Sequence, residues 1–242
     1  MLSNSANELK FEHRPANERG KADHGWLKSN HSFSFGQYHD TRHMGFGNLR
    51  VINDDQVEGG KGFGQHPHQN AEIFPYVLEG ALEHKDTLGN GSVVAAGGVQ
   101  YMSAGSGVSH SEFNPSQTDP MRFLQIWLIP AQENTAPRYE TMDIAAADKT
   151  GQLKLFLSHD GRDDSMRTEA DASVYAATLD GNQEVSFTLA SPRKGWVQVA
   201  DGSIKVNGQS LSKGDGLAID GEGLLIFSDG ENAEFLFFDL AV

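Results

Sequence analysis

The sequence predicts an all-β protein that contains two similar β-barrels in tandem. Its 242 residues include 27 glycines, and the chain lacks long stretches with helical periodicity. Short segments in which apolar and polar residues alternate are separated by glycine-containing turns throughout the chain. One such strand–turn–strand unit in the first half has a similar sequence in the second half. Closely spaced short strands of this kind are typical of a barrel or a jelly-roll sandwich.

The alternating segments can be placed along the chain. In the first half we predict strands at 49–53, 72–78, 81–85, 93–95, 100–103 and 123–129, with turns at 59–60, 79–80, 89–91 and 97–98. In the second half we predict strands at 196–200, 203–206, 216–219, 224–228 and 234–240, with turns at 201–202, 207–208 and 229–230. Period-two alternation in these segments indicates strands with one buried face.

An internal repeat supports two domains. The stretch 76–83 (Tyr-Val-Leu-Glu-Gly-Ala-Leu-Glu) resembles 198–205 (Gln-Val-Ala-Asp-Gly-Ser-Ile-Lys), and both alternate across an acidic-glycine turn. We predict an N-terminal domain at 1–133, a linker at 134–150 and a C-terminal domain at 151–242. Aligning the two glycines of the repeat places His66 opposite Thr188 and His68 opposite Ala190. Since His159 is the only histidine after His110, only the first copy can bind a metal through several histidines.

Composition narrows the possible functions. The chain has no cysteine, which excludes disulfides and thiolate ligands and fits a reducing compartment. A net charge of −14 argues against nucleic acid as a partner, because phosphate binding needs basic patches. No apolar run approaches the roughly 20 residues of a membrane helix, and the polar N-terminus lacks a secretory signal. We therefore expect a cytoplasmic protein without a membrane partner.

Two pairs of potential metal ligands stand out, His66-Pro67-His68 and His110-Ser111-Glu112. Residues i and i+2 of a strand point to the same face, so each pair projects two ligands into one space if both segments are strands. Imidazole and carboxylate suit divalent first-row transition metals. Four protein ligands leave open positions on an octahedral metal, where a substrate oxygen and O₂ or water can bind. The pattern predicts a mononuclear metal site.

One further residue is an alternative metal ligand, and the other histidines and aromatic residues are assigned other roles. Glu72 is a rival carboxylate because it lies four residues after His68 and has the same parity; periodicity does not separate it from Glu112. His84 is expected to point outward. Trp26, Phe33 and Phe35 are interpreted as core or pocket wall. The N-terminal histidines are interpreted as hydrogen-bonded or exposed, with one or two at a pocket rim, namely His13, His24, His31, His39 and His43.

Several of these segments resemble the pirin family of the cupin superfamily, and in particular its bacterial quercetin 2,3-dioxygenases. The resemblance lies in 62–68, 76–80 and 105–112, and extends to 24–27, 31–35, 50–55 and 237–240. It implies a bicupin whose N-terminal barrel holds the metal and whose C-terminal barrel is degenerate. It also implies the ligand set His66, His68, His110 and Glu112, and leaves Glu72 as a candidate neighbour of the ligands. The sequence departs from the usual family pattern at 69–75, where Pro75 predicts a bulged or edge strand.

The resemblance further implies a metal-dependent dioxygenase that opens the heterocyclic ring of flavonols such as quercetin with O₂, with Glu112 as general base. We expect one divalent transition metal per chain, iron first, with Zn, Ni, Co, Mn, Cu or Cd possible in a crystal. The alternative is a metal-binding regulatory or redox-sensing protein that docks a protein partner; a sugar isomerase is a third, weaker option. A monomer is expected, since one chain already supplies two barrels.

Overall fold

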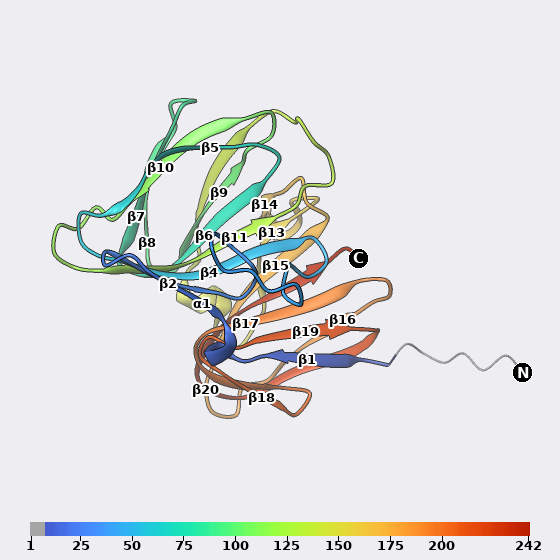
Figure 1. Cartoon of the computed structure of the whole chain (residues 1–242). Coiled ribbons are helices and arrows are strands. Elements are labelled where there is room, and N and C mark those ends of the chain that lie inside the picture. Colours follow the sequence, from blue (N-terminus) through green and yellow to red (C-terminus); the bar gives the residue numbers. More distant parts are fainter. Residues whose placement is uncertain (1–7) are drawn as a thin grey trace, which may run out of the picture.

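The structure is a computed structural model and describes residues 8–242. Its twenty strands form two β-barrels, one above the other in Figure 1, which confirms the predicted bicupin. The helical content is one short helix, α1 (Ala146–Lys149), and 3₁₀ turns at Ala16–Glu18 and Arg162–Asp164. Within 8–242 no helix is long and apolar enough to cross a membrane.

The first barrel consists of a seven-stranded sheet and a four-stranded sheet. The larger sheet has the order β12-β9-β6-β11-β4-β3-β2 and the smaller one β5-β10-β7-β8. The strands of the larger sheet are β2 (Gly20–Asp23), β3 (Leu27–His31), β4 (Leu49–Val57), β6 (Glu72–Glu79), β9 (Gly98–Ser103), β11 (Met121–Leu128) and β12 (Arg138–Asp143). Those of the smaller sheet are β5 (Gly62–His68), β7 (Ala81–Asp86), β8 (Gly91–Ala95) and β10 (Val108–Phe113).

The second barrel is a nine-stranded sheet that curls on itself. Its order is β1-β19-β17-β20-β15-β13-β14, with β16 paired to β20 and β18 paired to β17. The strands are β1 (Lys10–Arg14), β13 (Lys154–Ser158), β14 (Met166–Arg167), β15 (Ala172–Leu179), β16 (Val185–Leu189), β17 (Lys194–Val206), β18 (Gln209–Ser212), β19 (Gly216–Asp220) and β20 (Gly223–Leu240).

The edge strands of the two barrels do not follow the predicted domain boundaries. β1 precedes every strand of the first barrel in sequence, yet it pairs with β19 of the second (Figure 1). In turn β12, which lies in the segment predicted as a linker, pairs with β9 of the first barrel. The boundaries drawn at 134–150 stay a prediction.

Two of the predicted turns do not end strands. β17 runs through Asp201-Gly202 and β20 runs through Asp229-Gly230, so each is one strand where the sequence predicted two. Gly202 and Asp229 have positive φ, and the register between the two strands shifts near position 202. Local bulges of this kind bend a strand sharply without ending its ladder. In the first barrel, Gly80 makes the corresponding bend and separates β6 from β7.

Pro75 lies in the middle of the sheet, because β6 is flanked by β9 and β11. The expectation of an edge strand is therefore wrong. The register of β6 with β9 passes from Ile73↔Met102 to Tyr76↔Val99, and neither Phe74 nor Pro75 pairs with β9. The missing N–H of proline is accommodated at this interruption on the β9 side.

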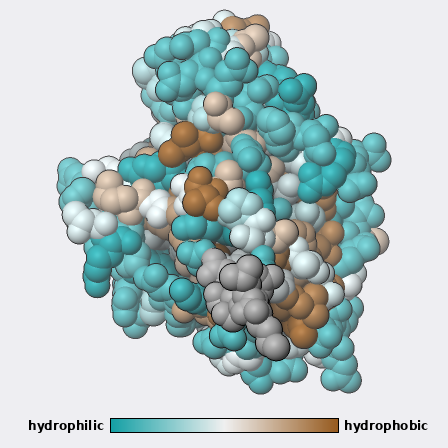
Figure 2. Space-filling view, turned by 90° about the vertical axis from the view of Figure 1, so that its right-hand side faces the viewer, coloured by the Kyte–Doolittle hydropathy of each residue, from teal (hydrophilic) through white to brown (hydrophobic). Residues whose placement is uncertain are grey.

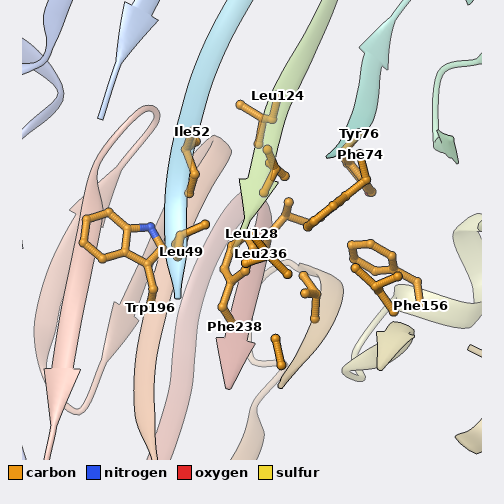
Figure 3. Close-up of a cluster of buried hydrophobic side chains, with 14 of the residues drawn as sticks. Leu49, Ile52, Phe74, Tyr76, Leu124, Leu128, Phe156, Trp196, Leu236 and Phe238 are labelled. Carbon is orange, nitrogen blue, oxygen red and sulfur yellow. The ribbon is translucent and has the colours of Figure 1, made fainter. Parts of the chain in front are cut away.

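The largest apolar core lies between the two barrels. In Figure 3, side chains from β4, β6 and β11 of the first barrel meet side chains from β17 and β20 of the second. A second cluster fills the interior of the second barrel. The interior of the first barrel instead holds two small clusters, around Phe123 and around Ile73. The reason is that polar side chains occupy the space between them.

The molecular surface is predominantly polar. The face in Figure 2 is mostly hydrophilic, with hydrophobic residues in small separate groups. The exposed large apolar residues are likewise scattered over both barrels, namely Met44, Leu88, Val93, Ile129, Leu224 and Val242. Single exposed apolar residues are ordinary on a folded protein and mark no docking surface.

Candidate metal centre

Three of the predicted ligands converge inside the first barrel. His66 and His68 lie on β5, and His110 lies directly opposite His66 on β10. The Nε2 atoms of His66 and His110 are 3.1 Å apart, and one ring nitrogen from each of the three histidines lies within 4.8 Å of the others. The Nδ1 atom of His66 donates to the carbonyl of Gly64 at 2.7 Å, which leaves its Nε2 lone pair free to bind a metal.

Burial keeps two of these histidines in the neutral form that binds metal. It lowers the pKa of His68 to about 4 and that of His110 to about 2, with neighbouring histidines adding to the effect. Both imidazoles are therefore neutral at physiological pH. Neutral imidazole is the form that coordinates a metal, so no proton has to be released from these two side chains on binding.

Glu112 lies next to His110 but outside the group formed by His66, His68 and His110, and two amides hold its carboxylate. Gln100 Nε2 donates to it at 2.9 Å and Gln125 Nε2 at 2.8 Å. An irregularity in the β10–β5 register separates His110 from Glu112, and one carboxylate oxygen lies within 4.8 Å of nitrogens of His84 and His110. Burial raises the pKa of Glu112 to about 7, and the nearby Asp55 adds to the rise. Such a carboxyl can accept and return a proton near neutral pH.

His84 belongs to this centre, so the expectation that it points outward is wrong. Its side chain is fully buried, because it shares the inward face of β7 with Leu82, two residues earlier. Its Nε2 donates to Asp86 at 3.2 Å, and its Nδ1 faces Nδ1 of His110 at 3.3 Å. His84 Nδ1 then accepts, and two donors face it, His110 Nδ1 and, at 3.4 Å, Gln100 Nε2. When His110 donates from Nδ1 it keeps the lone pair on Nε2, toward His66. The series Asp86–His84–His110 thus favours the tautomer that binds metal. The ring of Tyr139 stacks on His84 at 4.3 Å.

Replacing His84 with leucine is expected to weaken metal binding by about 10- to 100-fold, the usual cost of removing a group that orients a ligand. His110 would lose the acceptor that selects its tautomer, while all predicted ligands stay in place. The dissociation constant is measured by competition with a chelator. His159→Leu, at an exposed position in the second barrel, is the matched control. Equal affinities of the two variants would show that His84 does not orient His110.

Glu72 does not point toward the histidines. Its carboxylate faces the second barrel, where it accepts from Thr168 Oγ1 and the Glu169 N–H, both at 3.1 Å. It also accepts from Ser103 at 2.8 Å and from the Tyr101 hydroxyl. The suggestion that Glu72 shares the interior with His68 is therefore wrong. This carboxylate joins the two barrels.

The second barrel is filled where the first holds its histidines. Strand pairing matches β16 to β5 and the first part of β20 to β10. The inward-facing residues there are all apolar, namely Val185, Phe187, Leu189, Leu225 and Phe227. Thr188 and Ala190, which the ungapped repeat alignment placed opposite His66 and His68, are exposed, so that alignment is off by one residue. The expectation that only the first copy can bind metal through histidines is unaffected.

A pocket of about 640 Å³ reaches the centre's neighbour Phe63 and is lined by residues from β2, β3, β4 and β5 and from the loops after β2 and β3. His24, His31, Phe35 and Phe63 contribute to its wall, as predicted for one or two of the N-terminal histidines. Phe63 lies opposite Glu112 in the β5–β10 register. The ring of Trp127 lies 5.6 Å from Phe35 and 4.9 Å from His68. His13 lies away from this wall and pairs with Asp215 at 3.1 Å.

The fold and the site define a bicupin with one histidine-lined barrel and one apolar barrel. Comparison with known sequences identifies the family: the chain belongs to the pirins. The Pirin family pattern matches residues 12–128, and that of the quercetinase C-terminal cupin domain matches residues 155–240.

Several relatives resemble the chain over nearly its whole length. A quercetin 2,3-dioxygenase of Escherichia coli K12 is 46% identical over 228 residues, which cover 94% of this chain and 97% of the relative. A pirin-like protein of Caulobacter vibrioides is 38% identical, with 96% and 100% covered. The crystal structure of the Escherichia coli pirin YhhW in complex with nickel(II) superimposes with a TM-score of 0.91 at 44% identity, covering 96% of this chain and 99% of that one.

Proposed function

We propose that this protein is a metal-dependent dioxygenase that opens the heterocyclic ring of flavonols such as quercetin with O₂. The observation that carries the proposal is the convergence of His66, His68 and His110, with the buried carboxyl of Glu112 next to His110. Full-length relatives named quercetin 2,3-dioxygenase support the substrate class. The nickel complex of a pirin with 44% identity supports a single transition metal in this fold.

The residues of this chain fit such a metal. We infer that His66, His68, His110 and Glu112 hold one divalent ion, with iron as the first candidate. Three neutral imidazoles and one carboxylate suit this class of ion. When bound, the metal supplies positive charge and open positions for substrate oxygen and O₂.

Glu112 supplies the base in this proposal. Its carboxylate lies inside the barrel next to His110, where it can take the proton from the flavonol hydroxyl. Gln100 and Gln125 donate to its two oxygens and hold the carboxylate in place. The neighbouring pocket, walled by Phe35 and Phe63, offers apolar faces for a flat aromatic substrate.

The proposal is tested by removing all metal with a chelator and reloading the protein with Fe, Ni, Co, Mn or Cu one at a time. We expect loss of the visible absorption of quercetin under O₂ with at least one metal, and none with the metal-free protein. Elemental analysis of protein purified without a chelating tag identifies the native ion. Absence of turnover with every metal would favour the alternative, a regulatory protein that docks a partner.

We also infer that the protein is a monomer. The core between the two barrels already covers the large apolar sheet faces within one chain (Figure 3). Sedimentation of the purified protein measures this directly.

A further inference from the structure

Five buried polar atoms without a hydrogen-bond partner lie on one inner wall of the first barrel. They are His31 Nδ1, Asn53 Oδ1, Asp55 Oδ1, Gln125 Oε1 and Trp127 Nε1. The side chains alternate with residues of the interface core, such as Ile52, Leu124 and Ile126, so they face the opposite way, into the barrel. A buried polar group without a hydrogen-bond partner destabilises the folded protein. A concentration of five on one wall indicates a surface that a ligand completes.

Three of these residues form a continuous row. His31 pairs in register with Asn53, and Asn53 pairs in register with Gln125 on the next strand. Neighbouring strands are about 4.8 Å apart, so the row spans roughly 10 Å. At its inner end the Gln125 amide donates to Glu112 at 2.8 Å, which turns the orphaned Oε1 of Gln125 away from that carboxylate. The row therefore leads from the proposed metal centre outward.

The outer part of the row lines the pocket described above. His31, Asn53 and Asp55 belong to its wall, and each is less than 9% exposed. Its volume of about 640 Å³ is in the range of roughly 300–1,000 Å³ that is usual for small-molecule sites. Phe35 and Phe63 contribute apolar surface to the same wall. The free atoms of Asn53, Asp55 and Gln125 are oxygens that accept hydrogen bonds.

We propose that the row His31–Asn53–Gln125, with Asp55, is a subsite that binds the hydroxylated pendant ring of the substrate. The ligand is a flat phenol whose hydroxyl groups donate to the oxygens of Asn53 and Asp55, while its reacting end lies toward Glu112. This inference rests on the proposed function for the identity of the reacting end. The hydroxyl preference of the row itself does not depend on turnover.

The test compares two flavonols that differ only in the hydroxyl groups of the pendant ring. The protein is loaded with Zn²⁺, which has no redox chemistry, and the dissociation constant of each compound is measured by quenching of tryptophan fluorescence. We expect the wild type to bind the hydroxylated compound about tenfold more tightly. Asn53→Leu removes the central acceptor and is expected to bring this ratio close to one without weakening the unhydroxylated compound.

Two further variants keep the test decisive. Asn30→Leu changes the neighbouring β3 position, on the opposite face of the sheet, and should keep the wild-type ratio. His31→Phe, at the outer end of the row, should lower the ratio and serves if Asn53→Leu does not fold. A wild-type ratio near one, or an unchanged ratio in folded Asn53→Leu and His31→Phe, would overturn the subsite. If the Zn²⁺-loaded wild type shows the expected ratio but none of Fe, Ni, Co, Mn or Cu gives quercetin turnover, the proposed function is contradicted and the subsite stands.

Discussion

Glu112→Gln is expected to lower quercetin turnover by roughly 10²- to 10⁴-fold, the usual contribution of a general base. Glutamine has nearly the same shape as glutamate but cannot accept the proton. The substitution leaves His66, His68 and His110 unchanged. The variant should therefore keep most of its metal. The measurements are kcat for loss of quercetin absorption and metal content per chain by elemental analysis.

Glu133→Gln is the matched control, because Glu133 is exposed. It should leave both quantities at wild-type values. If Glu112→Gln retains full activity with metal bound, another group takes the proton and the role assigned to Glu112 is wrong. If the variant loses its metal together with its activity, Glu112 acts chiefly as a ligand.

The ligand pairs could be predicted because the metal pattern is local, although neither segment was among the predicted strands. His66 and His68, and likewise His110 and Glu112, are two residues apart, and a strand places such pairs on one face whatever its surroundings. The structure has strands at both segments and pairs them with each other. Their mutual pairing could not be read from spacing alone, since about forty residues lie between them.

For Glu72 and His84, odd or even residue spacing along the chain did not predict which way the side chain points. Asn70, with a positive φ, lies in the turn between β5 and β6, so counting residues from His68 to Glu72 does not preserve the face. The strand β6 is also buried on both faces, one toward the barrel interior and one toward the second barrel. Alternation cannot tell these faces apart. For His84 the signal was present, because its face is that of Leu82.

The polar row across β3, β4 and β11 illustrates a third limit. Its members come from distant parts of the sequence, and they meet only through strand register. Gln100 and Gln125, which hold Glu112, also come from two different strands. Non-local pairing of this kind requires the sheet order, which a single sequence does not contain.

Arg122→Met is expected to lower the free energy of unfolding by about 3–5 kcal/mol, the usual cost of breaking a buried ion pair from one side. Arg122 is buried between the barrels. It donates to both carboxylate oxygens of Asp54 at 2.8 and 3.2 Å, and to Asp201 and the Ala200 carbonyl of the second barrel, both at 2.8 Å. Methionine fills similar space but leaves the Asp54 charge with only Arg19, 3.5 Å away.

Lys205→Met provides the comparison for this loss of charge. The Lys205–Asp229 pair is 2.9 Å long, but its side chains are 46% and 63% exposed. An exposed pair contributes at most about 1 kcal/mol, because water screens it. Urea unfolding followed by tryptophan fluorescence measures both variants. If Arg122→Met destabilises the protein no more than Lys205→Met does, the Arg122 contacts do not hold the two barrels together, and the apolar core between them carries that role alone.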